Sequence, residues 1–85
     1  MAVVTCEELE AKIRTQMLNV DYVKAVDLSD GCGAKFEVTV VSSSFEGKAL
    51  LQQHRMVNKA IEEERPRIHA LTLKTVLPQN WVGEA

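Results

Sequence analysis

The sequence has few of the residues that small secreted or membrane-bound proteins depend on. Its two cysteines, Cys6 and Cys32, cannot form the several disulfides that support small secreted domains. No stretch approaches the roughly 20 apolar residues needed to span a membrane. The opening residues have neither a basic segment nor a long apolar run, so we expect no secretory or mitochondrial leader. The cytoplasm, the nucleus or both remain as the expected location.

Net charge is also small. Lys and Arg total 10 and Asp and Glu total 12, which gives a net charge of −2 with neutral histidines. A domain that holds nucleic acid mainly by neutralising phosphates needs a strong basic excess, so bulk electrostatic binding is disfavoured. A chain of 85 residues leaves no room for a second core. We therefore expect a single domain over residues 1–85.

The first half of the chain predicts one helix and a strand hairpin. Residues 5–8 read Thr-Cys-Glu-Glu, which fits a capping box, and apolar residues at four-residue spacing predict a helix from about 6 to 18. Segments 21–28 and 35–41 have the β-branched content or the alternation of strands. The turn-forming run 29–33 separates them, so they should pair as an antiparallel hairpin.

The second half predicts a longer helix and a third strand. Helical spacing resumes near Leu50, and Pro66 disfavours helical backbone at Arg65, so the helix should close by about Glu64. Residues 68–76 read as a strand. Trp81 should anchor a tail that is partly mobile from about residue 78. The simplest fold is α+β in the order αββαβ, with a three-stranded mixed sheet and both main helices on one face.

No catalytic grouping is visible. Glu62, Glu63 and Glu64 are consecutive, so they point in different directions and read as a solvated face. The serines at 42–44 read as turn and cap residues, and no nucleophile elbow, phosphate-binding loop or calcium loop is present. We therefore expect no enzyme activity.

Four side chains could bind a soft metal: Cys6, Cys32, His54 and His69. None has the spacing of a closed zinc site. The start of a helix could lower the pKa of Cys6, although a buried or idle thiol is the simpler interpretation. His54 shares an apolar stripe of the second helix, where a hydrogen-bonded residue at the edge of the core is the simpler interpretation.

Cys32 and His69 are better candidates. Cys32 sits between two glycines in the expected turn, and His69 opens the third strand. Loops of small rigid domains often carry binding groups, although a loop thiol and a histidine at a strand end are the simpler interpretation of each. Two ligands are half of a tetrahedral site. If they act together, a second molecule must complete the coordination.

Three stretches resemble the signature of the BolA family: FEGKALLQQHRMVN at 45–58, IHAL at 68–71, and DGCG at 30–33 ahead of FEV at 36–38. The Cys in the third stretch resembles the cytosolic and nuclear branch of the family. Gln53 stands where many relatives have Arg before the helix His. The resemblance covers nearly the whole chain and implies a fold similar to a type II KH domain.

The resemblance also implies a partner. BolA-like proteins work with monothiol CGFS glutaredoxins, and the two proteins share a [2Fe-2S] cluster in iron sensing and in iron-sulfur cluster trafficking. The glutaredoxin Cys and its bound glutathione would hold one side of the cluster. His69 would be a ligand from this chain, and Cys32 the less certain fourth ligand. Alone, the protein is expected to be a monomer without a cofactor.

Ligand chemistry fits that implication. Thiolates suit iron-sulfur clusters, and a histidine ligand raises the reduction potential, as in Rieske centres. A histidine must be neutral to bind metal, so we expect cluster binding to weaken in acid. Such a ligand is labile, which suits a protein that transfers a cluster or senses it.

Two other functions stay open. KH-like folds bind single strands, and Lys48, Arg55 and Lys59 could form a basic stripe on the second helix. A KH domain uses a GXXG loop, which this sequence lacks. The other alternative is a metal-free adaptor that grips glutaredoxin with the same surface.

Overall fold

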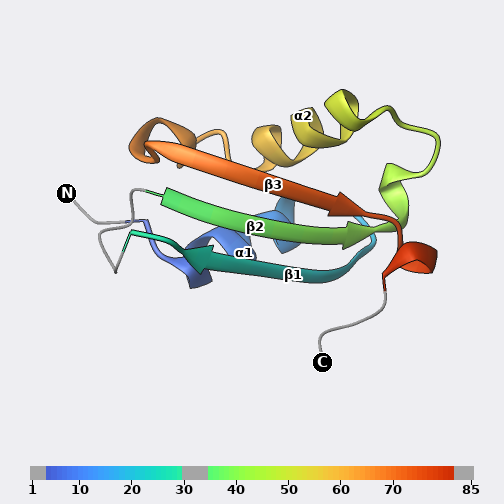
Figure 1. The fold of residues 1–85 in the computed structure, drawn as a ribbon, viewed down its shortest axis with the longest axis horizontal. Coiled ribbons are helices and arrows are strands. Elements are labelled where there is room, and N and C mark those ends of the chain that lie inside the picture. The colour runs from blue at the N-terminus through green and yellow to red at the C-terminus, as the bar shows by residue number, and fades with distance from the viewer. Residues whose placement is uncertain (1–3, 30–34, 82–85) are drawn as a thin grey trace.

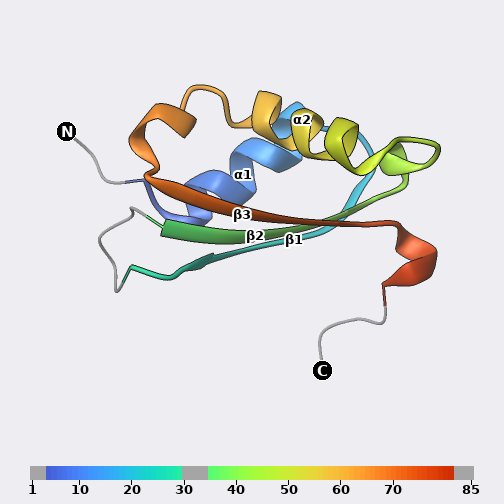
Figure 2. The same cartoon turned by 45° about the horizontal axis from the view of Figure 1, so that its top comes forward.

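The chain forms two helices on one face of a three-stranded sheet (Figures 1 and 2). The computed structural model describes residues 4–29 and 35–81. The sheet is mixed, and with two helices it makes the predicted α+β fold. The elements, with three short 3₁₀ helices, run α1 (Cys6–Gln16), β1 (Val20–Asp27), β2 (Lys35–Ser42), η1 (Ser43–Phe45), α2 (Leu50–Ala60), η2 (Arg65–Arg67), β3 (Ala70–Val76) and η3 (Pro78–Asn80).

Helix α1 begins where its cap predicts. The Thr5 hydroxyl accepts a hydrogen bond from the Glu8 amide at 3.1 Å, which satisfies one of the free amides of the first turn. The Glu8 side chain does not complete the capping box, because its carboxylate pairs with Arg67 instead. The helix ends at Gln16, two residues earlier than predicted, because Met17 is already extended.

Strand β2 is central in the sheet and pairs with both neighbours. It runs antiparallel to β1, with Val40 opposite Val23, and parallel to β3, with Phe36 opposite Leu71. The antiparallel pairing of β1 and β2 confirms the hairpin predicted from the sequence. The parallel pair needs a crossover, and α2 provides it.

The connection from α2 to β3 differs from the prediction. Both helices contain 11 residues, so the second is not the longer one. Helix α2 stops at Ala60, and Ile61 leaves helical geometry with φ −114° and ψ 27°. Ile61 and Ile68 are both buried, which pulls the intervening chain onto the core as turns rather than as helix. Strand β3 consequently starts at Ala70 instead of residue 68.

The serine run after β2 acts as the predicted turn and cap. Ser42 is fully buried, and its hydroxyl oxygen accepts from the Ser44 amide at 3.0 Å. The Ser42 and Ser44 hydroxyls both donate to the Leu18 carbonyl, at 3.2 and 2.9 Å. These contacts tie the start of η1 to the chain that follows α1.

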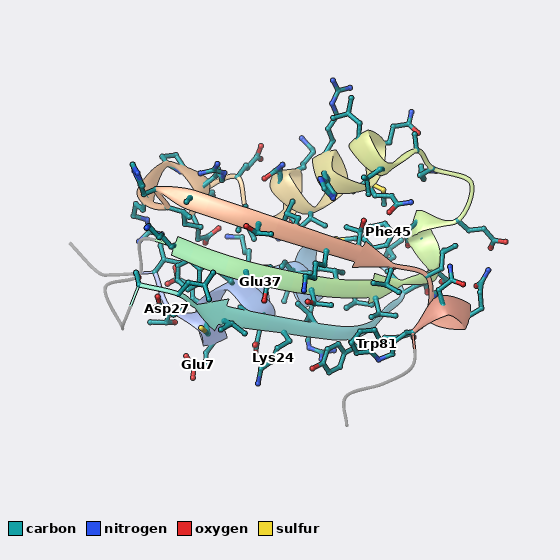
Figure 3. The ribbon with its side chains drawn as sticks, in the orientation of Figure 1. Glu7, Lys24, Asp27, Glu37, Phe45 and Trp81 are labelled. Atoms are coloured by element: carbon teal, nitrogen blue, oxygen red, sulfur yellow. The ribbon has the colours of Figure 1, made fainter. Side chains whose placement is uncertain are left out.

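The core lies between the helices and the sheet. None of the described helices is long and apolar enough to cross a membrane. The opposite face of the sheet carries no helix and displays polar side chains such as Lys24 and Glu37 (Figures 2 and 3). The fully buried core side chains come from both helices, β2, η1 and the turn after α2: Leu9, Ile13, Phe36, Val38, Val40, Phe45, Val57 and Ile61.

Candidate functional site

His69 lies at one end of the sheet, between η2 and β3. Its side chain is exposed, and no hydrogen bond joins its imidazole to any residue in 4–29 or 35–81. Strict strand alternation would place it on the same side as Leu71 and Leu73, which pack against the core. Because β3 begins only at Ala70, that alternation does not hold His69 inward. The imidazole is therefore accessible to a ligand or partner.

The register of the sheet decides what lies beside His69. Ala70 is opposite Lys35, the first residue of β2, in the parallel pair. The segment 30–34 joins Ser29 to Lys35, and the Leu28 amide donates to the Lys35 carbonyl at 2.8 Å. Both ends of that segment therefore attach at the end of the sheet where His69 lies. Cys32 itself falls outside the described residues.

A tight turn sets the backbone of His69. Pro66 lies in the first turn of η2, where its missing amide costs no hydrogen bond. The Ile68 amide donates to the Arg65 carbonyl at 3.0 Å, and Nη1 of Arg65 donates to the Ile68 carbonyl at 2.9 Å. The Ile68 side chain is buried in the core. Arg65 thus holds the carbonyl of the peptide unit that leads into His69 and the amide of the unit before it.

Cations gather around this end. Arg65 and Arg67 come just before His69, and Lys35 starts the neighbouring strand. Lys35 is exposed, and no ion pair with an acidic side chain is found for it among the described residues. Acidic side chains are present there too, because Arg67 is ion-paired with Glu8 and Asp27 ends the neighbouring strand β1.

The other two candidate ligands lie in less suitable settings. Cys6 is half-buried at the start of α1 and packs against the core. Burial, and next the carboxylate of Asp27, raise the pKa of its thiol, so the possible lowering by the helix start is not what the structure gives. His54 is half-buried on α2 and makes no hydrogen bond to another described residue. Cys6 is therefore a half-buried thiol at the edge of the core, close to the buried or idle thiol of the simpler interpretation.

The prediction of a solvated face for the acidic run 62–64 is wrong at one position. Glu62 and Glu63 are exposed, as a solvated face requires, but Glu64 is buried. Its carboxylate faces Lys12 of α1. No local pattern marks this pair, because its members are far apart in the sequence and one stands in a run of three identical residues.

The basic residues considered for nucleic acid are only partly brought together. Arg55 and Lys59 are exposed one turn apart on α2, whereas Lys48 precedes the helix. No salt bridge joins any of the three to an acidic side chain in the part of the chain that the structure describes. They provide a short basic strip rather than a continuous basic surface.

Within residues 4–29 and 35–81, no three histidine, cysteine or acidic side chains come together as a metal site. A metal or cluster held at His69 would therefore need further ligands, from segment 30–34 or from another molecule.

The comparisons with known proteins establish the family. The sequence model of the BolA-like protein family matches residues 5–80, and the chain belongs to this family. It is 52% identical to Protein BOLA2 of Arabidopsis thaliana over 79 residues, which cover 92% of this chain and 84% of the relative. It is 43% identical to BolA-like protein 2 of Mus musculus, with 94% and 93% of the two chains covered.

A solved structure agrees with this assignment. The crystal structure of a bol-like protein from Babesia bovis superimposes with a TM-score of 0.83 at 41% identity, covering 94% of this chain and 92% of the other. The αββαβ order and the sheet described above are therefore the fold of the family.

Proposed function

We propose that this BolA-like protein shares a [2Fe-2S] cluster with a monothiol CGFS glutaredoxin, and that it acts in iron sensing or cluster trafficking rather than as an enzyme. The observation that carries the proposal is the exposed imidazole of His69, at the end of the sheet where segment 30–34 attaches. His69 serves as one cluster ligand and Cys32 as the fourth. The partner's cysteine and its bound glutathione supply the other two.

The donor set fits such a cluster. Imidazole and thiolate both bind iron-sulfur clusters, and His69 has no hydrogen bond within the described chain to break first. A cluster bound by thiolates is anionic, and Lys35, which has no ion pair with a described acidic side chain, lies at the same end of the sheet as His69.

The test combines this protein with a cluster-loaded CGFS glutaredoxin and follows visible circular dichroism and native mass. We expect a heterodimer that carries two irons and has a changed spectrum. His69→Ala should lose that spectrum and still form the metal-free complex. His54→Ala is the matched control, because it removes the other histidine and leaves the end of the sheet intact. Cys32→Ala decides the fourth ligand.

Other results would select another function. If His69→Ala and Cys32→Ala both keep the spectrum, the protein is an adaptor that shares no metal. If mixing changes neither spectrum nor mass, the cluster proposal fails for this pair. Single-stranded nucleic acid is then the next ligand to test, with Arg55 and Lys59 as the first substitutions and the salt dependence of affinity as the measurement.

A further inference from the structure

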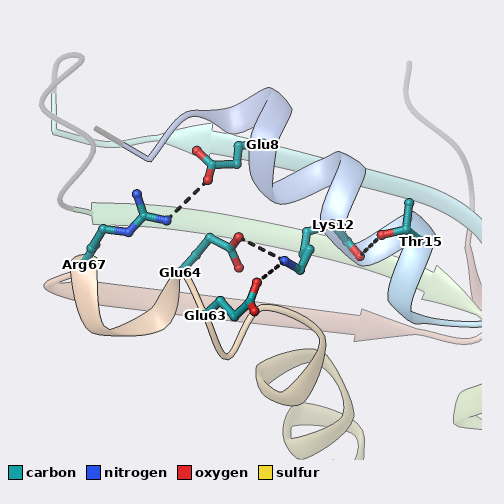
Figure 4. Close-up of polar contacts among 6 residues, drawn as sticks. All are labelled: Glu8, Lys12, Thr15, Glu63, Glu64 and Arg67. Carbon is teal, nitrogen blue, oxygen red and sulfur yellow. Dashed lines mark hydrogen bonds and ion pairs between the residues drawn. The ribbon is translucent and has the colours of Figure 1, made fainter. Parts of the chain in front are cut away.

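We propose that Lys12 is a positioning residue for His69, because it braces the turn that carries this histidine against α1. The proposal rests on the proposed function, since it treats His69 as a cluster ligand. The turn runs from Ile61 to Ile68 and connects α2 to β3. Three ion pairs join it to α1, which lies beside it (Figure 4).

Lys12 makes two of these ion pairs. Its ammonium donates to Oε1 of Glu63 at 2.6 Å and to Oε2 of Glu64 at 3.4 Å (Figure 4). The third joins Nη2 of Arg67 to Oε2 of Glu8 at 3.4 Å. Both cations are partly shielded, with side chains 26% and 33% exposed. The turn is therefore tied to α1 at two places, one before and one within η2.

Glu64 makes the Lys12 contact more than a surface ion pair. Its side chain is 6% exposed, and Oε1 has no hydrogen-bond partner in the described structure. Lys12 is the one cation among the described residues that forms an ion pair with this carboxylate. Without Lys12, the buried carboxylate would lack a countercharge, a costly state that is relieved when the group takes up a proton or moves into water. In both cases the turn loses the two ion pairs that hold Glu63 and Glu64 to α1, so removal of Lys12 should loosen the turn.

The loosening would reach His69 through a short chain of contacts. The Glu64 carbonyl accepts from the Arg67 amide at 2.9 Å. Arg65, next in sequence to Glu64, holds the amide and the carbonyl of Ile68. The Ile68 carbonyl belongs to the peptide unit that continues into His69. A movement of Glu64 would therefore reach His69 along the backbone of the turn, without passing through the core side chains.

His69 depends on this turn because its imidazole has no hydrogen bond to the rest of the described chain. A metal ligand must be held within about 0.5 Å of its productive position, and groups behind the ligand usually provide that precision. Here the ligand's own side chain is free, so its backbone must be fixed. Lys12 supplies part of the support that comes from α1, together with the Arg67–Glu8 ion pair.

The experiment compares Lys12→Met with Lys12→Arg and with Lys74→Met. Lys12→Arg keeps the charge. Lys74→Met is the matched control, because it breaks a lysine–glutamate pair of 3.3 Å, with Glu37, on the face of the sheet away from the turn. The first measurement is amide hydrogen exchange at Arg67 and Ile68 in the protein alone. The second is the rate at which the glutaredoxin heterodimer loses its cluster, followed by visible circular dichroism.

In Lys12→Met, we expect exchange at both amides to rise about 10-fold and cluster loss to quicken roughly 10-fold, the size of effect typical of groups that orient a metal ligand. Lys12→Arg and Lys74→Met should resemble the wild type in both measurements. Affinity for the metal-free glutaredoxin should stay within about twofold in all three variants, since none of them removes a proposed ligand and substitutions of surface side chains usually have small effects.

Several results would overturn the proposal. Unchanged exchange in Lys12→Met means that Lys12 does not brace the turn. Faster exchange with an unchanged cluster lifetime means that the brace does not position His69, while the proposed function stands. If the wild type forms no shared cluster, the proposed function fails and this inference fails with it. Should Lys12→Met not fold, Lys12→Gln removes the countercharge of Glu64 but keeps a polar group that can donate to it, and is expected to change both measurements in the same direction by a smaller factor.

Discussion

Trp81 stacks on Tyr22 across the face of the sheet that the helices leave open. The ring centroids are 5.0 Å apart and the ring planes are inclined by 28°. Val41 is opposite Tyr22 in the sheet and is fully buried, although no helix covers that face (Figures 2 and 3). The two rings therefore form a small second apolar cluster. The predicted anchoring by Trp81 is confirmed, and the anchor's partner is on β1.

Trp81→Ala should destabilise the protein by about 1–3 kcal/mol, because it removes the ring stack on Tyr22 and the apolar surface that this stack buries. The loss should be smaller than for a tryptophan at the centre of the core, since Trp81 is only half-buried. Urea denaturation followed by far-ultraviolet circular dichroism measures it. Trp81→Phe keeps a ring on Tyr22 and should retain most of the stability; equal losses in the two variants would contradict the stacking argument.

Glu10 protects the outer edge of the sheet. Its Oε2 accepts a hydrogen bond from the Ala25 amide at 2.9 Å, and this amide belongs to the edge strand β1. Glu10→Ala should cost about 1–2 kcal/mol, since a largely buried amide loses a charged acceptor. Amide exchange at Ala25 should quicken more than at Val23. The unpaired edge should also increase self-association at high concentration, which light scattering measures.

Glu10→Gln is the control for this edge. Its side-chain oxygen can still accept from the Ala25 amide, so most of the protection should return. If exchange at Ala25 is the same in wild type, Glu10→Ala and Glu10→Gln, the edge does not depend on this side chain.

The Lys12–Glu63 pair makes stability depend on pH. Its hydrogen bond lowers the pKa of Glu63 from the ordinary 4.5 and raises that of Lys12 from the ordinary 10.5. A lowered acid pKa stabilises the folded state above the ordinary value, and this contribution disappears as pH falls through the folded value. The raised lysine pKa stabilises it below 10.5, and that contribution disappears as pH rises further.

Wild type should therefore melt at a higher temperature than Lys12→Met at neutral pH. The difference should shrink below pH 4.5 and again above pH 10.5. Thermal denaturation across this range, at low salt, measures it. A difference that stays constant into acid would mean that lost packing of the lysine stem, rather than the ion pair, causes the effect.

His69→Ala should leave folding nearly unchanged. The side chain is exposed and makes no hydrogen bond within the described residues, so the free energy of unfolding should stay within about 0.5 kcal/mol of wild type. Ile68→Ala, one residue earlier, should cost about 2–5 kcal/mol, because Ile68 is buried. Denaturant unfolding of both variants tests this contrast. A strongly destabilised His69→Ala would make its loss of cluster uninformative.

Local chemistry predicted most of the fold. The Thr5 cap marks the start of α1, and the alternation from Phe36 to Val40 marks a strand with one buried face. Both signals depend on neighbours in the sequence, which a pattern can show. The sequence placed His69 at the opening of a strand over residues 68–76, whereas the structure places it just before β3. Whether Cys32 joins it stays a prediction.

The sequence patterns did not predict the features that depend on residues far apart in the chain. Helix α2 gives way to turns at Ile61 because Ile61 and Ile68 both enter the core, and helical spacing alone does not reveal that competition. The burial of Glu64 depends on Lys12, which a local reading of three glutamates cannot include. The ends of elements and the partners of buried charges are decided by tertiary contacts.

The parallel pairing of β2 with β3 also governs the order in which the candidate site can form. The β1–β2 hairpin is a local structure, and segment 30–34 lies in its connection. His69 arrives beside that connection only when β3 docks across the whole of α2, a non-local contact of the kind that slows folding. A partly folded chain with only the hairpin would hold one candidate ligand and lack the other. Competence for the proposed shared cluster would thus be a late event in folding.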